Sequence, residues 1–341
     1  MLWLFHIIAV ATPVGVPTTA NILGEAAGAA LQANAPRALE LLKKVDPSTL
    51  QEKDRHFVLC MRERFGTAAG HPQAEAGPMA DRLLDIYRDY WRSAALRPGD
   101  REAEEKRLEL RLRTLFGGRR SAGIDELEPL VAAALTKDGF HSLQGQTGLL
   151  RDLMIWSRQD TKTMRVPLPE GAQDVKVVLL DDFKSLGWGY YAACGRRGAG
   201  GWATKDALFA IVPRYESLDS EEFRVSFLGH EAQHFADLRR FKDIKPWELE
   251  YRAKLTELAL ANVTRPKILD KFVENQGDDP ASPHSYANKR ILADLVARLG
   301  LGGTDDLFIV ELSRLNEAAA GVLREDSVRR VIGNAPKNGL R

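Results

Sequence analysis

The spacing of apolar residues changes near residue 161, and this change constrains the fold more than any other feature of the chain. Before it, apolar residues recur at helical intervals, clearly so in residues 83–91, and predict an all-α region over residues 21–160. After it, β-rich runs bounded by Gly, Asp and Pro predict strands at residues 166–169, 175–180 and 207–212. The chain then turns helical again. We therefore expect an α+β protein that is mostly helical, with its strands at the start of the second part.

Length and composition narrow the classes of protein. A chain of 341 residues suggests two domains or one large one, and we place the domain boundary between residues 21–160 and 161–335. Lys and Arg number 48 against 47 Asp and Glu, so a formal net charge of +1 argues against a nucleic-acid partner. The 2 cysteines exclude a disulfide scaffold and a cysteine-rich metal site. The 7 histidines leave few candidates for metal binding, and the oligomeric state stays open.

The N-terminal segment is apolar over residues 2–16, which is too short to span a bilayer, so we expect no membrane span in the mature chain. Small residues follow at positions 18–20, as at a cleavage site, and residues 1–20 are interpreted as a signal peptide of an extracytoplasmic protein, periplasmic or secreted. No Lys or Arg precedes Arg37, so the alternative is a buried terminal strand or helix in a cytoplasmic protein. Cys60 and Cys194 are expected either to form a disulfide or to remain buried thiols.

The sequence His-Glu-Ala-Gln-His at residues 230–234 carries the clearest chemistry. On a helix, His230 and His234 project from one face one turn apart, so both imidazoles reach one Zn²⁺ ion. Glu231 lies beside the metal, where it can take a proton from a zinc-bound water. The alternative is two surface histidines with an unrelated glutamate, but the residues around the motif are uncharged, as a buried metal helix requires. A separate apolar stripe is expected to pack on the core, formed by Leu228, Ala232, Phe235 and Leu238.

A catalytic zinc site needs a third protein ligand, which here should be a carboxylate. A turn near residue 243 precedes a predicted helix that begins at Pro246 and carries three glutamates, Glu248, Glu250 and Glu257. Glu250 and Glu257 are seven positions apart and share a face. An antiparallel helix hairpin can bring either of them to the histidines.

The motif and the helix after it resemble the gluzincin branch of zinc metallopeptidases, over about residues 207–286. In that group the third ligand is a Glu followed three residues later by a small residue. Glu250 and Ala253 match that form and Glu257 does not, so the resemblance implies Glu250 as ligand, with Glu257 as the alternative. It also implies a zincin-like domain over residues 161–335 that holds one Zn²⁺ per chain.

The chain departs from the gluzincin pattern after Ala253. Several gluzincins have an Asp there that orients a zinc histidine, and this chain has Lys254. Asp237 lies seven residues after His230, on the histidine face, and Asp237 or Glu257 could supply the missing carboxylate. The sequence is equally consistent with Asp237 as a solvated residue on the helix surface.

Further candidates follow from the same resemblance. A donor for the reaction's oxyanion is expected from His284 or Tyr286 in a loop over residues 279–286, although both can be ordinary loop residues. Gluzincins bind the substrate backbone along an edge strand before the metal helix, a place that residues 207–212 take here, although a fully buried strand would have the same sequence pattern. The substrate-binding candidates, which can also be core aromatics, are Trp202, Phe209 and Tyr215.

These features predict a zinc metallopeptidase that acts on a peptide or protein substrate through a zinc-activated water, with Glu231 as general base. Two alternatives stay open. One is a structural or inactive zinc site in a helical interaction protein, against which the presence of Glu231 argues. The other is a zinc amidohydrolase that acts on cell-wall peptides.

Overall fold

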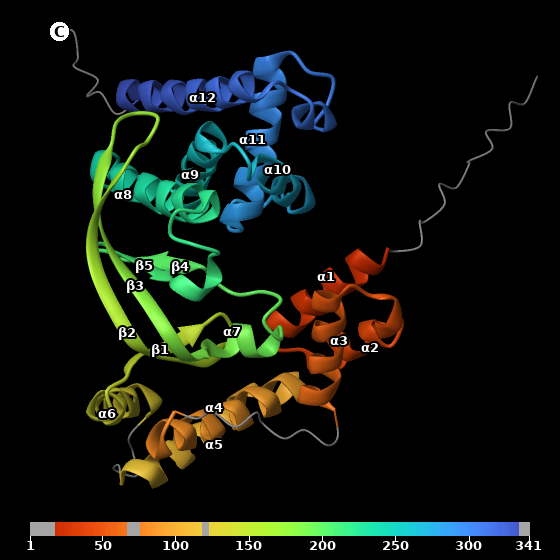
Figure 1. Ribbon diagram of the computed structural model, residues 1–341, viewed down its shortest axis with the longest axis vertical. Coiled ribbons are helices and arrows are strands. Elements are labelled where there is room, and N and C mark those ends of the chain that lie inside the picture. Colours follow the sequence, from red (N-terminus) through yellow and green to blue (C-terminus); the bar gives the residue numbers. More distant parts are fainter. Residues whose placement is uncertain (1–17, 67–75, 118–122, 334–341) are drawn as a thin grey trace, which may run out of the picture. The chain divides into compact units, whose positions relative to one another are not determined.

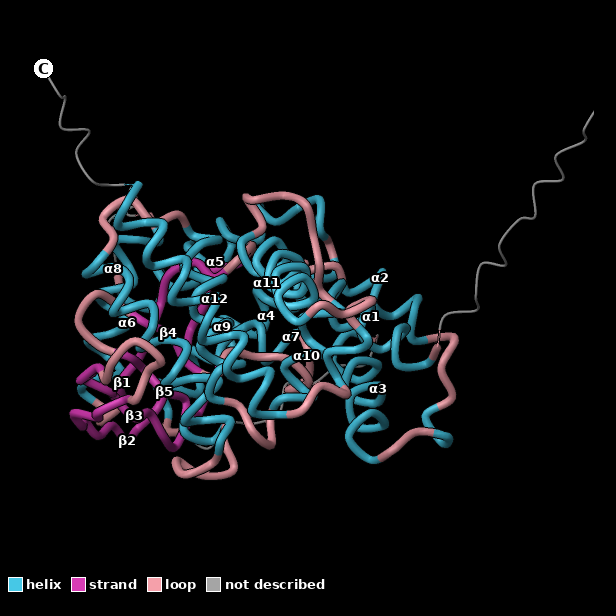
Figure 2. The backbone as a smooth tube through the Cα atoms, turned by 90° about the horizontal axis from the view of Figure 1, so that it is seen from above, coloured by secondary structure: helices cyan, strands magenta, loops and turns pink. Residues whose placement is uncertain are grey.

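A computed structural model of the protein describes residues 18–66, 76–117 and 123–333. It is a mixed α+β fold, mostly helical, with one five-stranded sheet in the order β1-β2-β3-β5-β4 (Figures 1 and 2). The predicted class is therefore confirmed at this coarse level. The predicted signal peptide lies outside the described residues as far as residue 17, and Thr18 already caps the first helix.

The described chain divides into two compact units. The first holds the chain up to Ser157 together with Phe183–Gly198, and the second holds Arg158–Asp182 together with the chain from Ala199. The chain thus passes between the units three times, within the two long strands β2 and β3 and again after Gly198. A single boundary near residue 161 does not describe this division, because apolar periodicity does not reveal a strand that continues from one unit into another.

Among its described residues, the first unit has six helices and a short seventh, which bury one apolar core. They are α1 (Thr19–Leu31), α2 (Ala35–Leu42), α3 (Glu52–Phe65), α4 (Pro78–Leu96), α5 (Arg101–Phe116), α6 (Ile124–Lys137) and α7 (Gly187–Ala192). Helix α4 shows why these helices could be predicted from apolar spacing. Pro78 is its first residue, and Leu84, Tyr87 and Trp91 are buried along one face.

The prediction of an all-α region over residues 21–160 is wrong at its end. Strand β1 (His141–Thr147) pairs antiparallel with the start of β2 (Leu150–Val166), twenty residues before the expected change. The sequence of β1, HSLQGQT, holds one large apolar residue and no run of β-branched ones, so it carries no strand signal. Residues 167–169, expected in a strand, lie after β2 ends.

The second unit combines part of the sheet with five α-helices. Its elements, with the remaining part of β2, are β3 (Gln173–Leu186, shared with the first unit), β4 (Gly201–Ala203), β5 (Leu208–Ile211), α8 (His230–Arg240), α9 (Pro246–Leu260), α10 (Arg265–Glu274), α11 (Pro283–Leu299) and α12 (Leu312–Gly333). One apolar core lies among α9 to α12. A second core joins residues of β3 and β5 to Phe227, Leu228 and Phe235 near the start of α8.

The predicted edge strand is an interior one. Residues of β5 pair in parallel with β3 on one side and antiparallel with β4 on the other, so β4 is the edge of the sheet. The segment of residues 201–203 is too short to be recognised as a strand from its sequence. Of the predicted apolar stripe on α8, Leu228, Ala232 and Phe235 are buried, but Leu238 is 55% exposed near the end of the helix.

A π-helical segment, η4 (Glu222–Gly229), leads directly into α8. Residue-by-residue propensity does not separate a π-helix from an α-helix, and π-helical turns concentrate near functional sites in proteins. The segment ends where the motif begins, at His230. On the far side of the turn after α8, Pro246 opens α9 as expected, and the Lys245 N–H donates a hydrogen bond to Glu248 at 2.8 Å.

The two cysteines form a disulfide between α3 and the turn that follows α7, both in the first unit. Cys60 and Cys194 are 134 residues apart in the chain. Among the described residues, no helix has both the length and the apolar character needed to cross a bilayer.

Candidate metal centre

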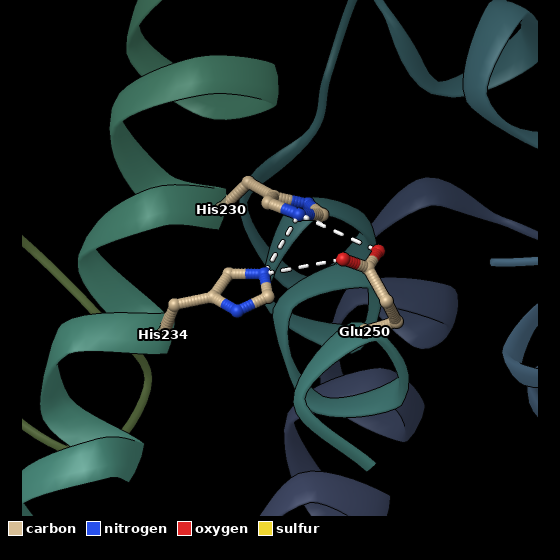
Figure 3. A group of neighbouring side chains, drawn as sticks. All are labelled: His230, His234 and Glu250. Carbon is tan, nitrogen blue, oxygen red and sulfur yellow. Dashed lines mark hydrogen bonds and ion pairs between the residues drawn. The ribbon is translucent and has the colours of Figure 1, made fainter. Parts of the chain in front are cut away.

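Three side chains from two neighbouring helices converge on one point (Figure 3). The Nε2 atoms of His230 and His234 are 2.9 Å apart, and each lies 3.6 Å from a carboxylate oxygen of Glu250. Tetrahedral ligands that hold Zn²⁺ at about 2.0–2.1 Å lie roughly 3.3 Å from one another. His230, His234 and Glu250 therefore have the spacing of ligands to a single ion, and together they can bind a metal.

The pairing of α8 with α9 sets this geometry. The helices are joined by residues 241–245, and later positions of α8 meet earlier positions of α9, as in an antiparallel hairpin. His230 of α8 contacts Glu257 of α9. Gln233, three residues after His230, accepts a hydrogen bond at 2.9 Å through its side-chain oxygen from the hydroxyl of Thr256. With this register, Glu250, two helical turns before Glu257 on α9, lies opposite the two Nε2 atoms.

The charges around the histidines favour a cation. Burial alone would lower the pKa of the His230 ring, but the carboxylates of Glu257 and Glu250 outweigh burial and raise it to about 10. The pKa of His234 is lowered to about 3 by burial and by the positive charge on His230. The carboxylates around the two rings therefore favour positive charge at this point, and a divalent cation would supply it.

Glu250 supplies a second sign that the residues present fit a metal ion. Its Oε2 atom is buried and accepts no well-aligned hydrogen bond from the described residues, although His284 Nδ1 is 2.8 Å away. Burial raises the pKa of a carboxyl group, but His230 and His284 together lower the pKa of Glu250 well below its usual range. An ionised, buried carboxylate oxygen that lacks a well-aligned hydrogen bond can serve as a metal ligand.

Glu257, the alternative ligand, takes a different place. Its Oε1 atom lies 2.5 Å from Nδ1 of His230, the ring nitrogen that faces away from Glu250. A carboxylate there fixes the ring orientation and keeps Nε2 free to bind a metal. The structure thus puts Glu250 with the two Nε2 atoms and Glu257 behind one of the rings.

The sequence analysis offered Asp237 as a carboxylate that orients a histidine, but its hydrogen bonds go to other residues. It is buried and accepts hydrogen bonds from Arg252 Nε at 2.9 Å and from Gln233 Nε2 at 3.0 Å. The guanidinium of Arg252, also fully buried, bonds in addition to Asp326 at 2.9 Å and to Glu170 at 2.8 Å. Because the carboxylates come from distant parts of the chain, no local pattern in the sequence pointed to this network.

Glu231 is a half-buried acid whose charge interacts with those of His230 and Glu250. Burial raises its pKa, while the positive charge on His230 acts in the opposite direction. A carboxylate whose pKa is raised toward neutrality is suited to accept and return a proton.

The two candidate donors to the oxyanion, His284 and Tyr286, have different surroundings. His284 and Tyr286 lie in the first turn of α11, because that helix begins at Pro283 and the expected loop ends there. His284 directs Nδ1 toward Glu250, and its side chain is 65% exposed. The Tyr286 hydroxyl instead accepts a hydrogen bond from Arg290 at 3.1 Å, and its ring packs edge-on against Trp247. Only His284 is brought to the cluster.

Lys254, which stands where several gluzincins have an aspartate, also approaches the cluster. Its Nζ atom is 3.9 Å from Glu250 Oε2 and lies over the ring of Phe272. The carboxylate that orients His230 therefore comes from Glu257, one turn later on α9.

The aromatic candidates for substrate binding lie at and after the sheet edge. Trp202 of β4 stacks on Phe209 of β5 with ring centroids 5.1 Å apart. Tyr215 packs against Phe223 and Phe227. Burial raises the pKa of Tyr215, and the nearby charge of Glu231 contributes to that increase, so this tyrosine lies within electrostatic range of the cluster.

The sequence matches no protein-family model, and neither a curated protein nor a solved structure is significantly similar to the chain. The function is therefore argued from the cluster itself.

Proposed function

We propose that this protein is a zinc-dependent metallopeptidase of the gluzincin type. The observation that carries the proposal is the convergence of His230, His234 and Glu250, with the half-buried Glu231 beside them. Two imidazoles and one carboxylate make up the ligand set of several zinc peptidases, and three protein ligands leave a position for water. The edge strand β4 and the H-E-x-x-H helix of this second unit are compatible with a zincin-like domain.

Each residue has a defined task in this proposal. A zinc ion held by the three ligands would lower the pKa of a water molecule and polarise the carbonyl of the peptide bond. Glu231 would accept a proton from that water and return it to the departing amine. Glu257 holds His230 through Nδ1, and the exposed ring of His284 can donate a hydrogen bond to the developing oxyanion. Tyr286 has no part in this proposal.

The disulfide supports the proposed extracytoplasmic location. Disulfides form and persist in secreted and periplasmic proteins and are rare in the cytosol. The Cys60–Cys194 bond and the apolar residues 2–16 agree in this respect.

The test compares the wild-type chain with Glu231→Gln, both loaded with one equivalent of zinc, on a mixture of unstructured peptides analysed by mass spectrometry. We expect cleavage by the wild type, and a loss of roughly 10²–10⁴-fold in the variant with its zinc content unchanged. Glu274→Gln, an exposed glutamate on α10, is the matched control and should cleave as the wild type does. Undiminished cleavage by Glu231→Gln would overturn the mechanism, and cleavage confined to amide-linked cell-wall fragments would favour the amidohydrolase.

A further inference from the structure

A lysine lies among the acidic and histidine side chains of the metal centre. Lys254 is on α9, one helical turn after Glu250, and its Nζ atom is 3.9 Å from Glu250 Oε2. The side chain of Lys254 is only 12% exposed, so its ammonium group is not a freely solvated surface charge. A positive charge therefore lies beside one of the three proposed metal ligands.

Two helices hold this ammonium group in place. On α9, Glu250 precedes Lys254 by four residues, which is the favourable order for an ion pair along a helix. On α10, the ring of Phe272 is buried, and the Nζ atom of Lys254 lies over it, 5.0 Å from the ring centroid. An ammonium group over an aromatic face is attracted by the ring. The charge of Lys254 is thus kept close to Glu250.

The position of Lys254 needs an explanation, because a positive charge opposes the binding of a cation. The negative charge that attracts a metal ion comes from Glu250 directly and from Glu257 through Nδ1 of His230. Glu231 adds a third carboxyl group beside the centre. Lys254 offsets part of this negative charge, and it does so next to a ligand oxygen.

A charge beside a ligand changes how the ligand acts on the metal. A carboxylate that also interacts with an ammonium group gives less of its negative charge to the ion. The ion is then held less tightly, and it keeps more positive charge with which to polarise a carbonyl group. Glu257 and Lys254 therefore act in opposite directions, since Glu257 makes His230 a stronger ligand and Lys254 makes Glu250 a weaker one.

We propose that Lys254 is a positioning residue of the metal centre that acts through Glu250. Its ammonium group lowers the affinity of the centre for zinc and leaves the bound ion more electrophilic. This inference rests on the proposed function, and it names the residue that limits how tightly the centre holds its metal.

Competition with a chelator measures the zinc affinity of the full chain and tests the proposal without any substrate. Lys254→Met removes the charge and keeps an unbranched side chain against Phe272. We expect this variant to bind one zinc ion at least about tenfold more tightly than the wild type, because residues that contact metal ligands commonly change affinity by roughly 10–100-fold. A loss of packing alone would weaken binding, so the direction of the change separates the charge from a structural role.

Three further variants complete the test. Lys254→Arg keeps a positive charge and should bind zinc as the wild type does. Lys271→Met removes an exposed lysine next to Phe272 on α10 and should also leave the affinity unchanged. The melting temperature of the metal-free protein reports folding, and Lys254→Gln carries the test if Lys254→Met does not fold.

Peptide cleavage gives a second measurement. In the zinc-loaded Lys254→Met variant, kcat should fall at an unchanged KM, because a less electrophilic ion polarises the carbonyl less. A kcat equal to that of wild type would contradict the part of the proposal that concerns the bound ion.

The affinities distinguish this inference from the proposed function. A zinc affinity of Lys254→Met equal to or weaker than that of wild type would overturn the role of Lys254 and leave the zinc centre standing. An equal gain in Lys271→Met would also overturn it, because the gain would then come from the net charge of the chain. Failure of the wild type to bind zinc would overturn the centre and this inference together, whereas zinc binding without peptide cleavage would count against the peptidase activity.

Discussion

The two ring nitrogens of His230 have different partners, and this difference organises the centre. Nε2 faces His234 and Glu250, and Nδ1 faces Glu257. A hydrogen bond from Nδ1 to a carboxylate fixes the tautomer and makes Nε2 a better metal ligand. The same ring would turn more freely without it.

Replacing Glu257 by Gln tests this role. The amide oxygen can still accept from Nδ1 but carries no charge, so zinc affinity should fall by roughly 10–100-fold while one zinc still binds. Competition with a chelator of known affinity measures the change. Glu274→Gln on α10 is the control with the same loss of charge at an exposed site. An affinity equal to that of wild type would show that Glu257 does not orient the ring.

The residues of the centre were only partly predictable. The spacing of His230 and His234 follows from helical geometry, which brings both rings to one face. Which glutamate meets them depends on the register between α8 and α9, in which Gln233 contacts Thr256 and Asp237 contacts Arg252. Glu250 was preferred over Glu257 by resemblance alone. The true partners of Asp237 could not be foreseen, because Arg252 meets it only after the helices pack.

At the scale of elements, a buried ionic network joins the second unit's helices. Arg252 of α9 bonds to Asp237 of α8, to Asp326 of α12 and to Glu170 between β2 and β3. The ring of Phe241, in the turn after α8, also lies under this guanidinium, 5.0 Å from it. The network holds α8 and α9 in the register that forms the metal centre.

Arg252→Leu should therefore destabilise the protein strongly. The change leaves buried carboxylates without their cation, which typically costs about 3–5 kcal/mol in the free energy of unfolding. Urea unfolding followed by circular dichroism measures the loss. Arg324→Leu, an exposed arginine on α12, should change stability by less than about 0.5 kcal/mol. Similar values for the two variants would argue against a stabilising network.

Elements differed in how well the sequence predicted them. Amphipathic helices such as α4 were predictable because one face is apolar and the other is polar. The strands of residues 141–147 and 201–203 were not, because the first is largely polar and the second is short. These two strands form because they pair with β2 and β5, and a local sequence pattern does not reveal such pairing.

At the scale of the whole molecule, the disulfide belongs to one of two units. It joins two residues of the first unit that are 134 positions apart, and the segment between them includes Arg158–Asp182 of the second unit. The metal centre belongs to the second unit. A cross-link that closes a long segment stabilises a fold mainly by restricting the unfolded chain.

The double variant Cys60→Ser and Cys194→Ser should lose about 2–5 kcal/mol of unfolding free energy. We expect the loss in the transition of the first unit, with zinc affinity unchanged, because the ligands lie on α8 and α9. Guanidinium unfolding followed by hydrogen exchange assigns the transition to a unit. A parallel loss of zinc affinity would show that the two units are coupled in stability.

The most direct test of the account is anomalous diffraction at the zinc absorption edge from crystals of the zinc-loaded protein. The account predicts one strong peak per chain, about 2.0–2.1 Å from Nε2 of His230, Nε2 of His234 and a carboxylate oxygen of Glu250, with water as the remaining ligand. A peak bound by a fourth protein side chain in place of that water, or one bound by Glu257 instead of Glu250, would contradict it.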